Sequence, residues 1–147
     1  MRMRSKSRPR NLESLYRVLD DLGLNDCVRI SELGSIVKVE VKYDPLERER
    51  KTLNLYRVQL KSLNSEDDPT PDQLVQQIDQ LLKRIELTRV ERVLVAAPSP
   101  EGLKLLEDQL ISIQKDILYR KSDTDELRRL VRLFISYIRE YLRRPVP

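Results

Sequence analysis

Apolar residues recur at helical spacing near the start of the chain. Asn11 is a suitable N-cap, and Gly23 supplies the residue type that ends helices in the left-handed conformation. Between them, one face carries Leu12, Leu15, Tyr16, Leu19 and Leu22. This spacing predicts an amphipathic helix between Asn11 and Gly23.

A second helical pattern begins at Thr70, where the residue types match a strong start signal. Thr70 is a good cap, Pro71 suits the first helical position, and Gln73 is placed to complete a capping box. The apolar stripe that follows contains Leu74, Val75, Ile78, Leu81, Leu82 and Ile85. We therefore predict a helix over these residues.

The C-terminal third predicts two more helices. Ser99-Pro100-Glu101 starts the first, which ends near Tyr119, and Ser122 or Asp123 begins the second. The first stripe contains Leu103, Leu106, Leu110, Ile113 and Ile117, and the second contains Leu127, Leu130, Val131, Phe134, Ile138 and Tyr141. Both stripes follow the alternating steps of an amphipathic helix.

Four segments favour strands. A short strand is expected from about Cys27 to Ser31, and after the turn at residues 32–35 an alternating segment predicts an amphipathic strand. In that segment Val37, Val39, Val41 and Tyr43 alternate with Lys38, Glu40 and Lys42. Residues 53–60 resume β-type composition after the turn at Asp44-Pro45, so they predict a third strand. The run from Val93 to Ala97 is apolar without alternation, which predicts a central strand covered on both faces.

These elements predict an α/β fold with a single domain. The order is α-β-β-β-α-β, followed by a C-terminal helical extension, and one crossover helix returns the last strand parallel to a neighbour in a mixed four-stranded sheet. We expect a basic disordered tail at residues 1–10, a core at 11–121 and an amphipathic helix at 122–147.

Composition narrows the class of protein. With 147 residues, 39% hydrophobic and 35% charged, the chain suits one globular domain, and its apolar runs are too short to span a bilayer. The basic start lacks the apolar segment of a secretory signal. We therefore expect no membrane association and a cytoplasmic location.

Several kinds of chemistry are excluded by missing residue types. The chain has no His, one Cys and three Gly, so it has no imidazole ligands, no intramolecular disulfide and no glycine-rich phosphate loop. Any bound metal would need oxygen ligands, which favours Mg²⁺, Mn²⁺ or Ca²⁺.

Basic charge gathers at both ends of a chain whose net charge is +4. The N-terminus carries Arg2, Arg4, Lys6, Arg8 and Arg10, and the C-terminus carries Arg139, Arg143 and Arg144. Such ends suit an anionic partner, most often nucleic acid, and we expect DNA rather than RNA. The alternative is a solubilising tail that binds nothing.

The element order and the acidic-x-Lys-like signatures resemble the PD-(D/E)xK, or restriction-endonuclease-like, nuclease superfamily over about residues 11–119. The resemblance implies that Glu40 on the second strand and Gln59-Leu60-Lys61 on the third form the catalytic site. Glu40 and Gln59 would then hold Mg²⁺, and Lys61 would face the scissile phosphate. Glu13 matches a further acidic position of the family.

Other placements remain open. Asp44 can replace Glu40, and Glu40-Val41-Lys42 is itself an acidic-x-Lys motif with Asp26 ahead of the preceding strand. The same polar residues also suit the ordinary solvated face of an antiparallel sheet.

The expected function is a nucleic-acid-processing protein, either a metal-dependent DNA endonuclease or a degenerate relative that only binds. Lys38, Lys42 and Arg57 would contact nucleic acid together with the N-terminal cations. The alternatives are a non-catalytic nucleic-acid-binding module and an oligomeric assembly protein whose C-terminal helices form a homodimer.

Overall fold

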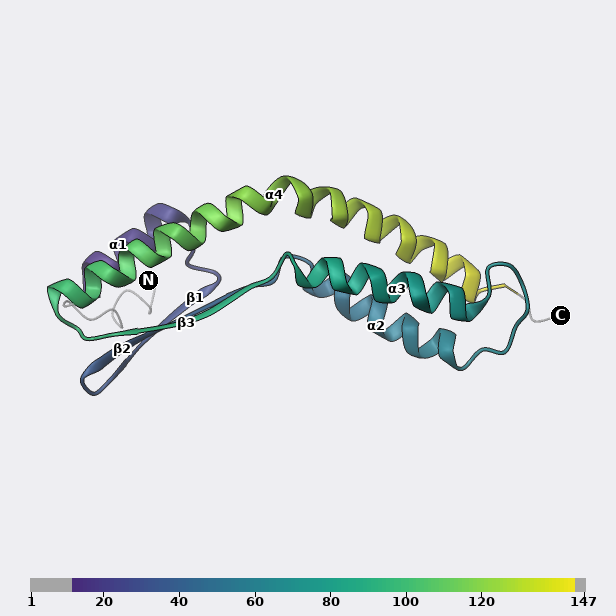
Figure 1. Cartoon of the computed structure of the whole chain (residues 1–147), viewed down its shortest axis with the longest axis horizontal. Coiled ribbons are helices and arrows are strands. Elements are labelled where there is room, and N and C mark those ends of the chain that lie inside the picture. Colours follow the sequence, from purple (N-terminus) through teal and green to yellow (C-terminus); the bar gives the residue numbers. More distant parts are fainter. Residues whose placement is uncertain (1–11, 145–147) are drawn as a thin grey trace, which may run out of the picture. The chain divides into compact units, whose positions relative to one another are not determined.

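The computed structural model describes residues 12–144, and over these it contains four α-helices and three β-strands (Figure 1). The elements in order are α1 Glu13–Leu22, β1 Val28–Leu33, β2 Ile36–Tyr43, α2 Glu47–Lys61, α3 Pro71–Glu86, β3 Val90–Ala96 and α4 Pro100–Leu142. The predicted α/β class is confirmed, but the predicted four-stranded sheet is wrong, because the sheet has three strands over the described residues. The predicted tail at residues 1–10 and the predicted cap Asn11 lie outside the described residues.

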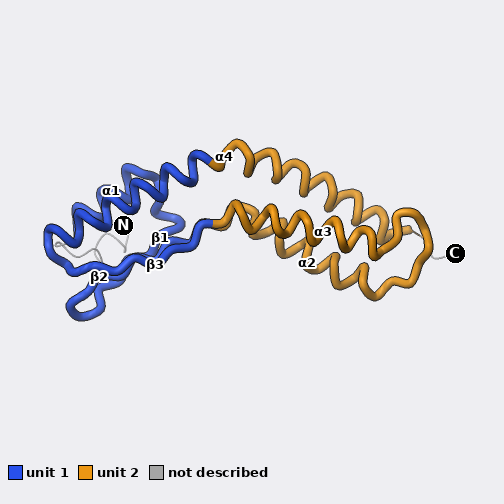
Figure 2. Tube along the Cα trace, in the orientation of Figure 1, with its two compact units in different colours: residues 1–43, 90–119 blue, residues 44–89, 120–147 orange. Residues whose placement is uncertain are grey.

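The described chain divides into two compact units, drawn in different colours in Figure 2. The first, called unit 1, comprises the described residues up to 43 together with residues 90–119. The second, called unit 2, comprises residues 44–89 and the described residues from 120 onward. Each unit has its own hydrophobic cluster.

Unit 1 is built on an antiparallel sheet with strand order β1-β2-β3. Val39 of β2 is in register with Ile30 of β1 and with Leu94 of β3, and both pairings are antiparallel. The prediction of a mixed sheet with a parallel last strand is therefore wrong. The clear alternation of β2 does form a strand as predicted, with Val37, Val39 and Val41 buried on one face.

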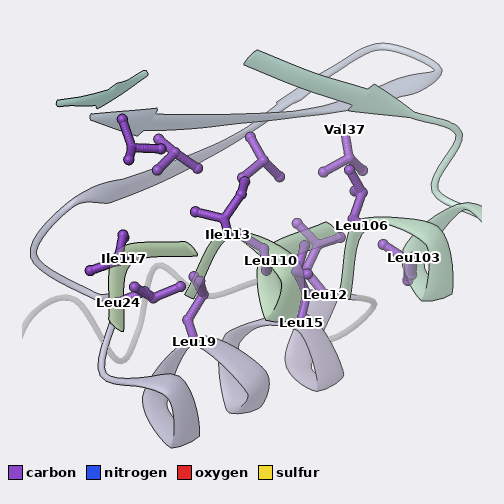
Figure 3. Packing of buried hydrophobic residues seen from close by; sticks show 13 residues of the cluster. Leu12, Leu15, Leu19, Leu24, Val37, Leu103, Leu106, Leu110, Ile113 and Ile117 are labelled. Atoms are coloured by element: carbon purple, nitrogen blue, oxygen red, sulfur yellow. The ribbon is translucent and has the colours of Figure 1, made fainter. Parts of the chain in front are cut away.

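The core of unit 1 lies between the sheet and two helices on one side of it (Figure 3). Val37 points from the sheet toward Leu106 of α4, while Leu15 and Leu19 of α1 complete the cluster from below. Gly23 ends α1 with a φ of 69°, a left-handed conformation that glycine adopts without strain. The helices thus cover one sheet face.

The strand β3 differs from its prediction. It lies at the edge of the sheet, paired only with β2, and not at the centre. Val93 is 62% exposed and Val95 is 53% exposed, both on the face opposite the core. The continuous apolar run therefore does not mark a strand buried on both faces.

The helix α2 replaces the strand predicted at residues 53–60. Leu46, Leu53 and Leu60 are fully buried at intervals of seven residues, which is two helical turns. Val58, which suggested a strand, is 67% exposed. The buried leucines recur every seven residues, as they do along one face of a helix, whereas Tyr56, Val58 and Leu60 alternate as in a strand. The segment forms a helix because that arrangement buries all three leucines.

Unit 2 consists of α2, α3 and the second half of α4 around a hydrophobic cluster of its own. The start of α3 is confirmed: Thr70 accepts a hydrogen bond from the Gln73 amide, and Gln73 accepts one from the Thr70 amide. The buried residues from the three helices are Leu46, Leu53, Leu60, Leu74, Val75, Ile78, Leu81, Ile85, Leu127, Val131, Ile135, Ile138 and Tyr141.

The helix α4 is continuous over 43 residues. The prediction that one helix ends near Tyr119 and another begins at Ser122 is wrong, because the intervening residues contain no Gly or Pro to break the hydrogen-bond ladder. None of the helices among residues 12–144 carries an apolar segment of the length that a bilayer requires.

Candidate functional site

The three predicted catalytic residues do not share the strand pair expected of them. Glu40 lies on the outer face of β2 in unit 1, whereas Gln59 and Lys61 lie at the end of α2 in unit 2. Two residues apart on a helix, Gln59 and Lys61 point in roughly opposite directions. The acidic-x-Lys geometry, which needs both side chains on one face of a strand, therefore does not form at residues 59–61.

The alternative motif, Glu40-Val41-Lys42, does lie on a strand, as the acidic-x-Lys geometry requires. Glu40 lines an open pocket of about 350 Å³ together with Asp26, Cys27, Val28, Arg29 and Lys42. The pocket lies at the start of β1, where Arg29 is in register with Glu40 of β2. The antiparallel pairing thus brings Asp26, Glu40 and Lys42 to one rim.

This rim does not fit Mg²⁺. Its two carboxylates, from Asp26 and Glu40, share the pocket with the cations of Arg29 and Lys42. The carboxylate of Glu40 also lies 3.7 Å from the Lys38 ammonium. Cations so close oppose a hard dication, and among residues 12–144 no group of three or more Cys, Asp or Glu side chains is placed to hold a metal.

Cys27 is half-buried on the same pocket, and its thiol donates a hydrogen bond to the Leu24 carbonyl at 3.5 Å. Burial raises the pKa of the Cys27 thiol, and the nearby Asp26 carboxylate raises it further. A raised pKa keeps the thiol protonated at neutral pH, so Cys27 is a poor nucleophile.

The predicted phosphate-binding cations are partly engaged within the protein. Arg57 donates from Nε to Asp79 Oδ1 at 2.6 Å, which links α2 to α3. This hydrogen bond raises the pKa of Arg57 and lowers the pKa of Asp79. Lys38 pairs with Glu40, and Lys42 is exposed. The N-terminal cations Arg2, Arg4, Lys6, Arg8 and Arg10 lie outside the described residues.

The two remaining acidic candidates have other surroundings. Asp44, the alternative to Glu40, is nearly buried and accepts a hydrogen bond from Arg50 Nη2 at 2.5 Å. Glu13 is exposed at the first residue of α1, where a carboxylate favours the positive end of the helix dipole. Both carboxylates therefore have structural roles, Asp44 in an ion pair and Glu13 at the start of a helix.

The surface that sequence reasoning missed is the outer face of the sheet. Val93 stands in register beside Glu40, which stands beside Arg29, and Val95 stands beside Lys38. Exposed Leu33 adds apolar surface from β1. Apolar and charged side chains therefore alternate across a face that α1 and α4 leave uncovered. In the sequence, the sign of this surface was the apolar run of β3, but such a run is equally typical of a strand that is buried on both faces.

The charge of unit 1 is nearly balanced. Its described residues carry eleven Asp and Glu against seven Lys and Arg, a net charge of −4. Residues 1–11 belong to the same unit and add five Lys and Arg with no Asp or Glu, which brings its net charge to +1, so net charge favours neither nucleic acid nor a basic partner.

The chain is not similar enough to known proteins for any of them to indicate its role. No family model matches it, and neither a curated protein nor a solved structure matches it significantly.

Proposed function

We propose that the chain is a non-catalytic protein-interaction module that binds an extended peptide segment of a partner along β3. The observation that carries this proposal is the exposure of Val93 and Val95 on an edge strand. Within residues 12–144, the second edge of β3 has no strand paired to it.

Open edges of this kind are unusual, because unpaired backbone groups invite another strand. Proteins commonly protect such edges with charged side chains. The opposite edge strand, β1, carries Arg29 and Glu32, but residues 93–96 of β3 carry no charge. The unprotected half of β3 therefore suits addition of a strand from a partner, a recurring mode of peptide recognition.

The surroundings of β3 define the chemistry of the partner. A strand laid beside β3 projects alternate side chains over the outer face, where apolar residues would cover Val93 and Val95. Covering each valine contributes about 1 to 2 kcal/mol. The outer face carries the cations of Lys38 and Lys42 beside the carboxylate of Glu40, so charge does not define the other residues of the segment. The partner is therefore an extended segment with alternating apolar residues.

Selection from a library of random displayed peptides tests this proposal. The full chain is immobilised, and the enriched peptides are measured for binding to the wild type and to Val93→Glu. We expect enriched sequences to alternate apolar and polar residues, and we expect Val93→Glu to weaken binding about tenfold or more, because a carboxylate replaces covered apolar surface.

Val58→Glu is the matched control, since Val58 is 67% exposed and lies on α2 in unit 2. It should leave peptide binding unchanged, and circular dichroism should show both variants folded. Failure to enrich any peptide, or equal binding to wild type and Val93→Glu, would falsify the proposal.

A further inference from the structure

The second half of α4 carries a continuous exposed stripe on its outward side. The stripe, called here the α4 seam, consists of Asp123, Glu126, Leu130, Leu133, Tyr137, Glu140 and Arg144. All seven residues are exposed, although unit 2 buries the other side of the same helix. Their steps alternate between three and four residues, which is the spacing of a coiled-coil seam.

The middle of the α4 seam is apolar. Leu133 is 72% exposed, and Leu130 and Tyr137 are also exposed one helical turn to either side. The Tyr137 ring stacks on Phe134, with centroids 6.4 Å apart and an interplanar angle of 19°. This contact fixes the ring beside the two leucines, so the seam offers a preformed apolar surface.

The ends of the α4 seam differ in charge. The N-terminal end carries two carboxylates, Asp123 and Glu126. At the C-terminal end Arg144 lies over the Tyr141 ring at 5.0 Å, and Glu140 is offset by Arg143 at 3.4 Å. The seam therefore runs from a negative end to a positive end.

We infer that a second copy of this chain binds along the α4 seam in antiparallel orientation. In a parallel pair each charged residue of the seam faces its own copy, so Glu126 meets Glu126 and Arg144 meets Arg144. An antiparallel pair that keeps the apolar centres opposed instead places Arg144 of each copy opposite Asp123 of the other. It places Glu126 opposite Glu140, whose charge is offset by Arg143. Charge complementarity thus selects both the partner and its direction.

The extent of the seam sets the strength of the dimer. A stable complex usually buries about 800 Å² on each partner. A single helical stripe with three apolar side chains at its centre covers less than that. The dimer therefore dissociates on dilution.

Sedimentation equilibrium of the full chain from about 1 to about 300 µM tests the inference. We expect a reversible monomer–dimer equilibrium in the wild type and a dissociation constant raised at least about tenfold in Leu133→Glu. Leu87→Glu is the matched control, because Leu87 is also 72% exposed but lies beyond α3 and off the seam. Val93→Glu should likewise leave the dimer intact, which separates this inference from the proposed peptide site.

A charge exchange tests the orientation. Asp123→Arg and Arg144→Glu should each weaken the dimer, because each places like charges together across an antiparallel pair. The double variant should restore dimerisation, since it reverses both partners of each contact. A wild type that stays monomeric at every concentration, or a Leu133→Glu variant that dimerises normally, overturns the inference. A double variant no better than the single ones overturns the antiparallel orientation.

Discussion

At the scale of single residues, Asp44 shows how a candidate site residue can serve folding. Its carboxylate is nearly buried in unit 2, 2.5 Å from Arg50 Nη2 and 3.5 Å from Arg89 Nε. Two cations thus converge on one buried anion. Removing one partner of a buried pair is strongly destabilising, because the other charge stays desolvated.

We predict that Asp44→Asn lowers the free energy of unfolding by about 3 to 5 kcal/mol. The amide keeps the shape of the side chain but leaves the charge of Arg50 uncompensated. Urea unfolding followed by circular dichroism measures the change. Asp125→Asn is the control, because Asp125 pairs with Arg128 in a partly exposed position and should matter by less than about 1 kcal/mol. Equal effects of the two substitutions would show that the Asp44 cluster has no special role.

At the scale of elements, the start of α4 depends on one glycine. Ser99 accepts a hydrogen bond from the Gly102 amide at 3.1 Å and so caps the helix. A Cβ atom added at Gly102 would lie 2.0 Å from the Ala97 carbonyl oxygen. The connection from β3 to α4 therefore has no room for a larger residue.

We predict that Gly102→Ala destabilises the protein by about 1 to 3 kcal/mol, as overpacking does. In an open helical position the same substitution would stabilise by about 1 kcal/mol, so the sign of the effect reports the contact with Ala97. Ser112→Ala, at an exposed position of the same helix, is the control and should stabilise slightly. Thermal unfolding of the three proteins distinguishes the cases, and a stabilised Gly102→Ala variant would contradict the close contact.

How far the elements could be predicted depended on how many signals agreed. For α3 the cap, the proline and the apolar stripe all indicated a helix, and the helix forms as predicted. For α2, Tyr56 and Val58 favoured a strand, while the seven-residue spacing of Leu46, Leu53 and Leu60 favoured a helix. Local composition and the buried face disagreed there, and burial in the unit 2 core decided the outcome.

The prediction for β3 failed for a different reason. An apolar run shows that a strand has two apolar faces, but it does not show what covers them. Only the pairing of β3 with β2, far away in sequence, places it at an edge with Val93 and Val95 exposed. The candidate peptide-binding surface therefore could not be recognised from the sequence.

At the scale of the whole molecule, the predicted nuclease site required Glu40 and Gln59, which are close in sequence, to be close in space as well. Glu40 and Gln59 are only 19 residues apart, yet they belong to different units, because the chain leaves unit 1 after Tyr43 and returns at Val90. The pattern of residues along the sequence does not show where the chain passes from one unit to the other. The Asp26, Glu40 and Lys42 rim was accessible to sequence reasoning, since one hairpin brings those residues together.

The two units also predict how the molecule unfolds. Each buried cluster draws its residues from one unit only, with Leu110 in the cluster of unit 1 and Leu53 in that of unit 2. A substitution that opens a cavity should therefore weaken mainly its own unit. We predict that Leu53→Ala lowers the protection of unit 2 amides against hydrogen exchange by about 2 to 5 kcal/mol, as cavity formation does.

Amides of β2 should keep their protection in the Leu53→Ala variant, and Leu110→Ala should produce the opposite pattern. Residue-resolved hydrogen exchange by NMR measures both variants under the same conditions. If both substitutions lower protection equally in the two units, the molecule unfolds as one cooperative structure, and the continuous α4 helix that both units share is the element through which that coupling would act.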